Sequence, residues 1–166
     1  PVYQPIFSLD DGFCVGFEGL VRPAAGSGFR NASALFVAAE SVSRTVELDL
    51  AAVRGLAAGA SGLGADQYLA LNLSPRTLEA VAFNPHEVLG MLASAGIEPR
   101  RLVIELTERE AVEDMDQLIR GLAVFRRTGA RIAADDVGAG NAGLQLLSRI
   151  EFDLIKIDLS LVQGGA

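Results

Sequence analysis

Short apolar runs alternate with helical patterns along the chain, in an order typical of an α/β protein. Residues 2–9 and 14–22 are predicted to be strands, and the short turn Asp10-Asp11-Gly12 between them favours an antiparallel hairpin. Strands separated by single helices form parallel sheets with right-handed crossovers. The remaining pattern predicts helices over 31–42 (capped by Asn31 or Ser33), 45–60, 84–96, 112–128 and 142–149, and strands over 68–74, 101–108, 131–136 and 152–159.

Polar residues keep a period of two within these strands, so each strand has one face of Leu, Ile or Val and another with acids or amides. The acids lie toward the carboxyl ends of the strands, which is where (β/α)₈ barrels build their sites. A Rossmann-type sheet is the competing architecture, but its glycine-rich turn is absent. The in-phase groups are Glu18, Leu20 and Arg22; Asn72 and Ser74; Glu105 and Thr107; Arg131 and Asp135; and Lys156 and Asp158.

Glu18, Asn72, Glu105 and Asp135 form an all-oxygen set, with one member from each of four strands. Oxygen ligands favour hard cations such as Mg²⁺ or Mn²⁺ over zinc. Asp136 follows Asp135 and could serve a second ion, and two close ions support phosphodiester cleavage. Each acid alone could equally be a cap or a surface charge, so the hypothesis of a metal site depends on their common phase.

Composition narrows the class of protein. The 166 residues are 50% hydrophobic, which excludes a disordered chain, and no uncharged apolar run is long enough to span a membrane. No signal peptide is recognisable at the start, and a single cysteine excludes an intrachain disulfide. We therefore expect a cytoplasmic protein, or the cytoplasmic part of a membrane-anchored one.

Charge narrows the class of partner. The net charge of −7 disfavours duplex nucleic acid, but an anionic small ligand remains compatible if a metal ion or arginine meets its phosphates. Only one of the 14 basic residues is a lysine, Lys156. Either compositional bias left one lysine by chance, or position 156 requires a compact ammonium group rather than a planar guanidinium.

Five motifs together resemble the EAL domain family of bacterial cyclic di-GMP phosphodiesterases and, when degenerate, cyclic di-GMP receptors. The resemblance covers the whole chain and implies a TIM-like barrel whose first strand is antiparallel to the rest. It also implies hydrolysis of cyclic di-GMP to pGpG with two ions of Mg²⁺ or Mn²⁺, and inhibition by Ca²⁺. The motifs are Phe17-Glu18-Gly19-Leu20-Val21-Arg22, Asn72-Leu73-Ser74, Glu105-Leu106-Thr107-Glu108, Asp135-Asp136-Val137-Gly138-Ala139-Gly140 and Lys156-Ile157-Asp158.

The resemblance also implies residue roles. Glu18, Asn72, Glu105 and Asp135 are similar to the family's first-metal ligands, and Asp136 to its second-metal ligand. Lys156 resembles the residue that positions the attacking water, and Glu108 the acid that braces the loop after Asp136. Substrate-side positions are matched by Arg22, expected at a phosphate, and by Gln4, Leu20, Glu40 and Asp158.

The sequence departs from the family pattern in two places. The loop after Asp136 has Asn141 and Ala142 where the family has an aromatic residue and a serine. The chain also lacks the family's last two strand motifs, so residues 1–166 are interpreted as a partial EAL domain of about six strands, against roughly 250 residues for a complete barrel. We expect it to belong to a longer protein with a sensory or GGDEF domain and a tendency to form homodimers; completion of the barrel by another copy or fragment is the alternative.

Three functions therefore stay open. The first is a cyclic di-GMP phosphodiesterase, favoured by the complete set of oxygen ligands. The second is a non-catalytic cyclic di-GMP receptor, favoured by the altered loop at Asn141 and Ala142 and the absent seventh-strand glutamate. The third is an unrelated metal-dependent barrel enzyme acting on sugars or keto acids, which requires the motif matches to be coincidental.

Overall fold

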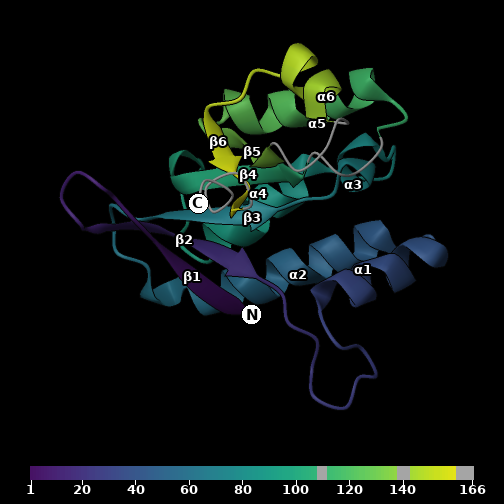
Figure 1. Ribbon diagram of the computed structural model, residues 1–166, viewed down its shortest axis with the longest axis horizontal. Helices are drawn as coiled ribbons and strands as arrows, with labels where there is room; N and C mark the ends of the chain where they lie inside the picture. Colours follow the sequence, from purple (N-terminus) through teal and green to yellow (C-terminus); the bar gives the residue numbers. More distant parts are fainter. Residues whose placement is uncertain (108–111, 138–142, 160–166) are drawn as a thin grey trace, which may run out of the picture.

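A six-stranded sheet organises the part of the chain that the computed structural model describes, residues 1–107, 112–137 and 143–159 (Figure 1). The strands lie side by side in the order of the sequence, with β1 antiparallel to β2 and every later pair parallel. The predicted hairpin and parallel sheet are thereby confirmed. The strands are β1 (Val2–Phe7), β2 (Cys14–Leu20), β3 (Tyr68–Asn72), β4 (Leu102–Thr107), β5 (Arg131–Val137) and β6 (Leu154–Ile157).

Side-chain caps fix where several of the helices begin. Asn31 caps the first helix by accepting the Ala34 N–H, and Asn84 caps the fourth by accepting the His86 N–H. The fifth helix begins three residues later than predicted, because Asp114 accepts the Gln117 N–H and so fixes its start. The helices are α1 (Ala32–Ser41), α2 (Thr45–Gly59), α3 (Pro75–Glu79), α4 (Pro85–Ser94), α5 (Met115–Arg127) and α6 (Gly143–Arg149), with 3₁₀ turns at Ala60–Gly62 and Pro99–Arg101.

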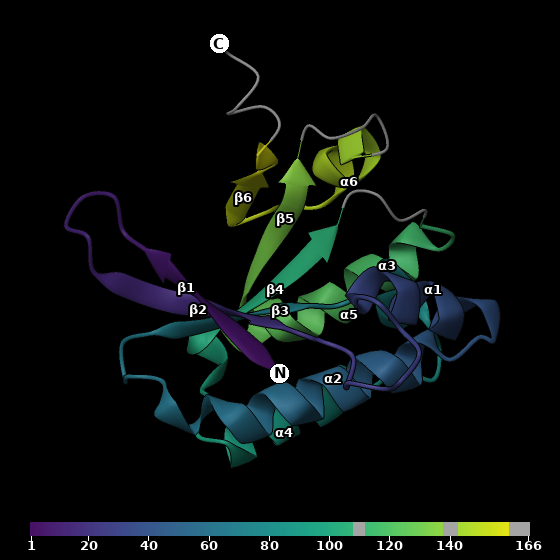
Figure 2. The same ribbon diagram turned by 60° about the horizontal axis from the view of Figure 1, so that its bottom comes forward.

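The main hydrophobic core lies between one face of the sheet and the helices α2, α4 and α5, which lie beside that face in Figure 2. Burial of these aliphatic side chains supplies the main driving force for folding. The core combines Leu69, Leu71, Ile104 and Ile132 of the strands with Val53 and Leu56 of α2, Val88 and Leu92 of α4, and Leu118, Leu122 and Phe125 of α5.

The opposite face of the sheet is the inner face of a curled half-barrel, and it carries a second, smaller apolar cluster. Ala70, Val103 and Ala133 are buried there, with Tyr68 and Leu154 packed against them. Space on this face is tight: a Cβ atom added to Gly16 would lie 2.7 Å from Cγ of Tyr68. The Arg131 guanidinium lies over the Tyr68 ring, 4.8 Å from its centroid. The polar residues of the inner face lie next to this apolar cluster.

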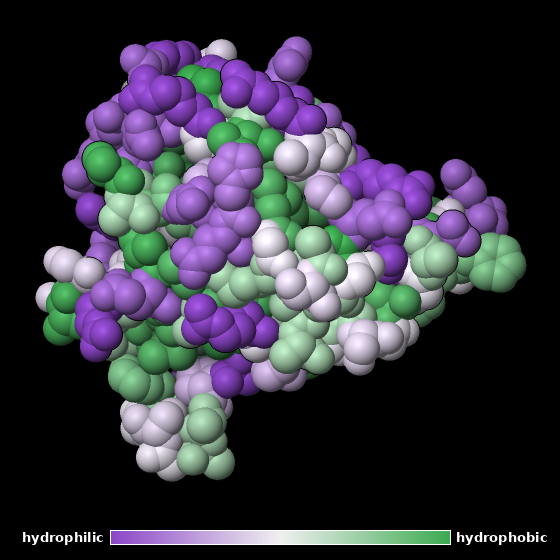
Figure 3. Space-filling model, turned by 180° about the vertical axis from the view of Figure 1, so that it is seen from behind, coloured by the Kyte–Doolittle hydropathy of each residue, from purple (hydrophilic) through white to green (hydrophobic). Residues whose placement is uncertain are grey.

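The surface mixes polar and apolar residues, as the view from behind shows (Figure 3). Large apolar side chains are exposed at the β1–β2 turn, where Phe7, Leu9 and Phe13 lie, along β6 at Ile155 and Ile157, and at Leu159, two residues after β6. The alternation along β6 puts Ile155 and Ile157 on the face opposite Lys156. Within the described residues, no helix combines the length and apolarity that crossing a membrane requires.

Candidate metal centre

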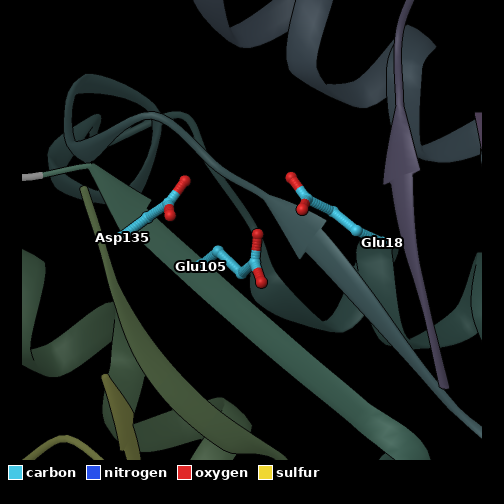
Figure 4. Close-up of side chains that lie close together, drawn as sticks. All are labelled: Glu18, Glu105 and Asp135. Carbon is cyan, nitrogen blue, oxygen red and sulfur yellow. The ribbon is translucent and has the colours of Figure 1, made fainter. Parts of the chain in front are cut away.

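Three carboxylates from three strands converge on the inner face of the sheet, near the carboxyl ends of the parallel strands. The register explains why: Glu18 lies beside Ala70, Asn72 beside Glu105, and Thr107 beside Asp135, so in-phase residues of neighbouring strands share the inner face. One carboxylate oxygen each from Glu18, Glu105 and Asp135 lies within 4.8 Å of the other two. Figure 4 shows the three side chains pointing toward one another. We call these three residues the acidic triad.

The ammonium group of Lys156 lies among the three carboxylates of the acidic triad. Its Nζ is 2.8 Å from Oε2 of Glu105, 3.0 Å from Oε2 of Glu18 and 3.0 Å from Oδ1 of Asp135. Burial alone would lower the pKa of Lys156, but its hydrogen bonds and attraction to Glu105 and Asp135 outweigh this and keep the pKa above its usual value. The single lysine of the chain is therefore a protonated cation at the centre of the triad.

Glu105 is the buried member of the triad, with 2% of its side chain exposed. The pKa of Glu105 is raised to about 7, chiefly by burial; the hydrogen bond and positive charge of Lys156 oppose the rise, and the negative charges of Glu18 and Asp135 add to it. Glu18 and Asp135 keep 16% and 18% of their side chains exposed, and Lys156 keeps 32%. One side of the triad is therefore accessible to a ligand, and the other is sealed by the sheet.

Asn72 completes the oxygen set from the end of β3. Its Nδ2 donates a hydrogen bond to Oε1 of Glu18 at 3.1 Å, which joins the amide to the acidic triad. Because the amide nitrogen of Asn72 is engaged in this way, the amide oxygen is the atom with which Asn72 can bind a cation. Glu18, Asn72, Glu105 and Asp135 are therefore brought together as the sequence pattern predicted.

Asp136 lies at an irregularity in β5. The β5–β6 register shifts between Ala134 and Val137, and Asp136 has a φ of +58°, a left-handed conformation uncommon outside glycine. Its N–H donates to Oδ1 of Asp135 at 3.0 Å. The shift lets consecutive aspartates share one end of the strand, and the role of Asp136 at a second ion stays a prediction.

The predicted substrate-side residues surround this end of the sheet to different degrees. Gln4 lies directly opposite Glu18 in the β1–β2 ladder, and Leu20 is the last residue of β2. Asp158 follows β6, and its N–H donates to the Val137 carbonyl at 3.3 Å. Arg22 is exposed and donates to the Val21 carbonyl.

Among the described residues, Glu40 forms an ion pair with Arg76 and not with the triad. Glu40 is exposed on α1 and accepts from Nε of Arg76 at 3.0 Å, while the same guanidinium contacts Glu113 at 3.1 Å. Glu108 lies outside the described residues. The substrate role of Glu40 and the bracing role of Glu108 stay predictions.

Sequence reasoning missed a buried acid near the site. Asp49 of α2 is 1% exposed, and its Oδ2 accepts the Ser74 N–H at 3.1 Å, two residues after Asn72. A signal for it was present, since Asp49 falls on the same helical face as Val53 and Leu56, which are in the core. An acid in phase with a buried apolar face marks a specific buried partner.

The residues present fit a hard divalent cation. Three carboxylates and an amide supply only oxygen ligands, which Mg²⁺ and Mn²⁺ prefer. The triad also holds a positive charge already, that of Lys156, within hydrogen-bond distance of every member.

Comparison with known proteins shows to which family the chain belongs. The sequence-family model of the EAL domain matches residues 1–166. The chain belongs to the EAL domain family. Both the family resemblance and the fold prediction are confirmed, since solved structures of this family superpose on the six-stranded curled sheet with its antiparallel first pair.

Two of those structures contain cyclic di-GMP and calcium. BlrP1 of Klebsiella pneumoniae has a TM-score of 0.82 and 32% identity, over 97% of this chain and 40% of BlrP1. YkuI of Bacillus subtilis has a TM-score of 0.78 and 28% identity, over 99% of this chain and 42% of YkuI. BlrP1 has also been solved with manganese and cyclic di-GMP.

A signalling protein of Caulobacter vibrioides is 33% identical over 163 residues, which are 98% of this chain and 20% of that protein. The chain thus spans about one fifth to two fifths of the length of these three relatives.

Proposed function

We propose that this EAL domain is a metal-dependent phosphodiesterase that hydrolyses cyclic di-GMP to pGpG. The observation that carries the proposal is the acidic triad with Asn72 at its edge, an oxygen-only set at the carboxyl ends of parallel strands. Family membership supports it, because similar structures hold cyclic di-GMP with manganese or calcium. An anionic substrate approaching a chain of net charge −7 also needs cations at the point of contact.

In this proposal Glu18, Asn72, Glu105 and Asp135 hold one Mg²⁺ or Mn²⁺, and Asp136 holds a second. Such ions, when bound, activate water and stabilise the leaving oxygen of a phosphodiester. With an ion bound, the three carboxylates that accept from Lys156 would serve as its ligands, and the Lys156 ammonium would be free to donate hydrogen bonds to the attacking water. Calcium keeps the ligand bound without supporting turnover.

The residues around the triad bind the substrate in this proposal. Arg22 meets a phosphate, while Gln4, Leu20, Glu40 and Asp158 line the approach. Glu108 braces the loop that follows Asp136. The exposed side of the triad, at Glu18 and Asp135, is where the scissile phosphate is brought.

The second candidate is a cyclic di-GMP receptor without turnover. It is favoured by Asn141 and Ala142, which replace the aromatic residue and the serine of the family's loop. A receptor would bind cyclic di-GMP through the same residues and transmit binding to neighbouring domains.

We also propose that this chain is the first part of a longer barrel in a cytoplasmic, multidomain signalling protein that forms homodimers. The exposed apolar side chains of Ile155 and Ile157 on β6, and of Leu159 just after it, support further elements packing against them. The greater length of the relatives is consistent with additional sensory or GGDEF domains.

The test is hydrolysis of cyclic di-GMP by the full-length protein, with pGpG quantified by chromatography in Mg²⁺, Mn²⁺ or Ca²⁺. We expect pGpG with Mg²⁺ or Mn²⁺ and none with Ca²⁺ or chelator. Asp135→Ala should abolish turnover, whereas the matched control Glu47→Gln, an exposed acid on α2, should not change it. Binding of cyclic di-GMP without pGpG in any metal would establish the receptor, and absence of both would contradict both candidates.

A further inference from the structure

Asp49 connects helix α2 to the strand end that carries Asn72. The Asp49 side chain is almost fully buried, yet it belongs to none of the groups that face the acidic triad. Burying a carboxylate is costly unless hydrogen bonds compensate it, so an acid at this place needs a specific partner. One such partner is a backbone group: Oδ2 of Asp49 accepts the Ser74 N–H at 3.1 Å.

Ser74 is the point at which the chain leaves the sheet. β3 ends at Asn72, and the Leu73 N–H still donates to the Glu105 carbonyl at 3.2 Å, as in the parallel ladder. At Ser74 the chain turns into α3. The Ser74 hydroxyl accepts the Arg76 N–H, and Pro75 occupies the first helical turn. Asp49 therefore holds the first backbone N–H beyond the ladder.

The hydrogen bond between Asp49 and the Ser74 N–H lies two residues along the chain from Asn72, which is part of the candidate site. Asn72 has to present its side chain to Glu18, with which it shares a 3.1 Å hydrogen bond, and its orientation depends on the backbone at the end of β3. Leu73 is buried in the main core and anchors one side of this short segment, while Asp49 anchors the next residue. Without Asp49, a buried N–H would lack its acceptor and the strand end would relax.

We infer that Asp49 is a positioning residue that sets the orientation of Asn72 toward the cation through the Ser74 amide. This inference rests on the proposed function, because it assigns Asn72 to the metal. A charge-assisted hydrogen bond from a rigid helix is a suitable device, since it is stronger than a neutral one. Residues behind metal ligands that hold them in place typically change metal affinity by 10–100-fold when replaced.

The experiment measures Mn²⁺ affinity by electron paramagnetic resonance in the full-length protein, alongside thermal unfolding. Asp49→Ala should weaken Mn²⁺ binding about tenfold. Asp49→Asn, which keeps an oxygen acceptor for the Ser74 N–H, should stay within about threefold of the wild type. Val88→Ala in α4 is the control: it opens the same core away from the site, so it should lower the melting temperature without changing Mn²⁺ affinity.

A double-mutant cycle distinguishes positioning of Asn72 from a general loss of stability. If Asp49 acts through Asn72, then Asp49→Ala should have little further effect on Mn²⁺ affinity in an Asn72→Ala background. If Asp49→Ala does not fold, Asp49→Ser replaces it in the same cycle. The serine side chain is shorter than that of aspartate, so its hydroxyl lies farther from the Ser74 amide.

Two results would overturn the inference. One is a wild-type Mn²⁺ affinity in Asp49→Ala with a melting temperature lowered as in Val88→Ala, which would make Asp49 purely structural. The other is an additive cycle with Asn72→Ala. A wild-type protein that binds no Mn²⁺ at all would instead overturn the proposed function, and this inference with it.

Discussion

Replacing Glu105 with glutamine should change the pH dependence of stability in a way that can be worked out from the structure. Glutamine keeps the size of the side chain and removes its charge. Glu105 is buried, and its pKa is raised from 4.5 to about 7, chiefly by that burial. In the metal-free protein, ionising Glu105 therefore opposes folding.

The sign and size follow from proton linkage. Because the folded-state pKa lies above the unfolded value, the stabilising contribution of protonated Glu105 is fully present below pH 4.5 and is lost as the pH rises through about 7. A shift of this size corresponds to about 3 kcal/mol, most of which is lost between pH 5 and pH 8. Glutamine does not titrate, so the free energy of unfolding of Glu105→Gln relative to wild type should rise by most of that amount over this range, whatever the difference between the two proteins at pH 5.

The measurement is urea unfolding of the complete domain at several pH values in the presence of chelator. Far-UV circular dichroism is the appropriate signal, since this chain contains no tryptophan. Glu47→Gln, which neutralises an exposed glutamate on α2, controls for the change in net charge. Saturating Mn²⁺ should flatten the wild-type pH dependence toward that of the variant, because a bound cation favours the ionised carboxylate.

Parallel stability curves for wild type and Glu105→Gln from pH 5 to pH 8 would refute this reasoning. They would mean that Glu105 is already ionised at pH 5, and that Lys156 compensates its burial completely.

Three further predictions concern other parts of the structure. Lys156→Arg should lose about a hundredfold or more in kcat while retaining cyclic di-GMP binding in Ca²⁺, because a planar guanidinium misplaces the attacking water. Steady-state hydrolysis paired with a binding isotherm checks this, and a retained kcat would mean that Lys156 only balances the charge of the carboxylates. Gly16→Ala should lower the free energy of unfolding by about 1–3 kcal/mol, because its Cβ would lie 2.7 Å from Tyr68. Urea unfolding that matches wild type would show that the apolar cluster around Tyr68 can adjust to the added methyl group. Residues 1–166 alone should be oligomeric or poorly stable, because β1 and β6 lie at the edges of the described sheet; sedimentation that shows a cooperatively unfolding monomer would argue against this.

The strand pattern predicted much of the candidate site, because the physics that sets it is local. A period of two assigns Glu18, Glu105 and Asp135 to one face, and the parallel order of the strands then brings their ends to one edge. The hairpin of β1 and β2 could also be predicted, since the connection between them is too short for a parallel crossover.

What the sequence could not predict depends on contacts between distant residues. Lys156 contacts Glu18, 138 positions away, only because the sheet curls and because β5 shifts its register at Asp136. The partnership of Glu40 with Arg76, and that of Asp49 with Ser74, depends on how α1 and α2 pack beside α3. Helix α3 itself was missed because five residues are too few to show a helical period, although Ser74-Pro75 carries a capping signal.

The central claim is that the acidic triad is a metal centre at which Lys156 gives up its carboxylate partners. Anomalous diffraction from crystals of the complete domain grown with Mn²⁺ and cyclic di-GMP tests it most directly. We predict a manganese peak coordinated by Glu18, Asn72, Glu105 and Asp135, with the Lys156 ammonium displaced from the triad toward the scissile phosphate. Manganese bound elsewhere, with Lys156 still joined to all three carboxylates beside bound cyclic di-GMP, would contradict the account.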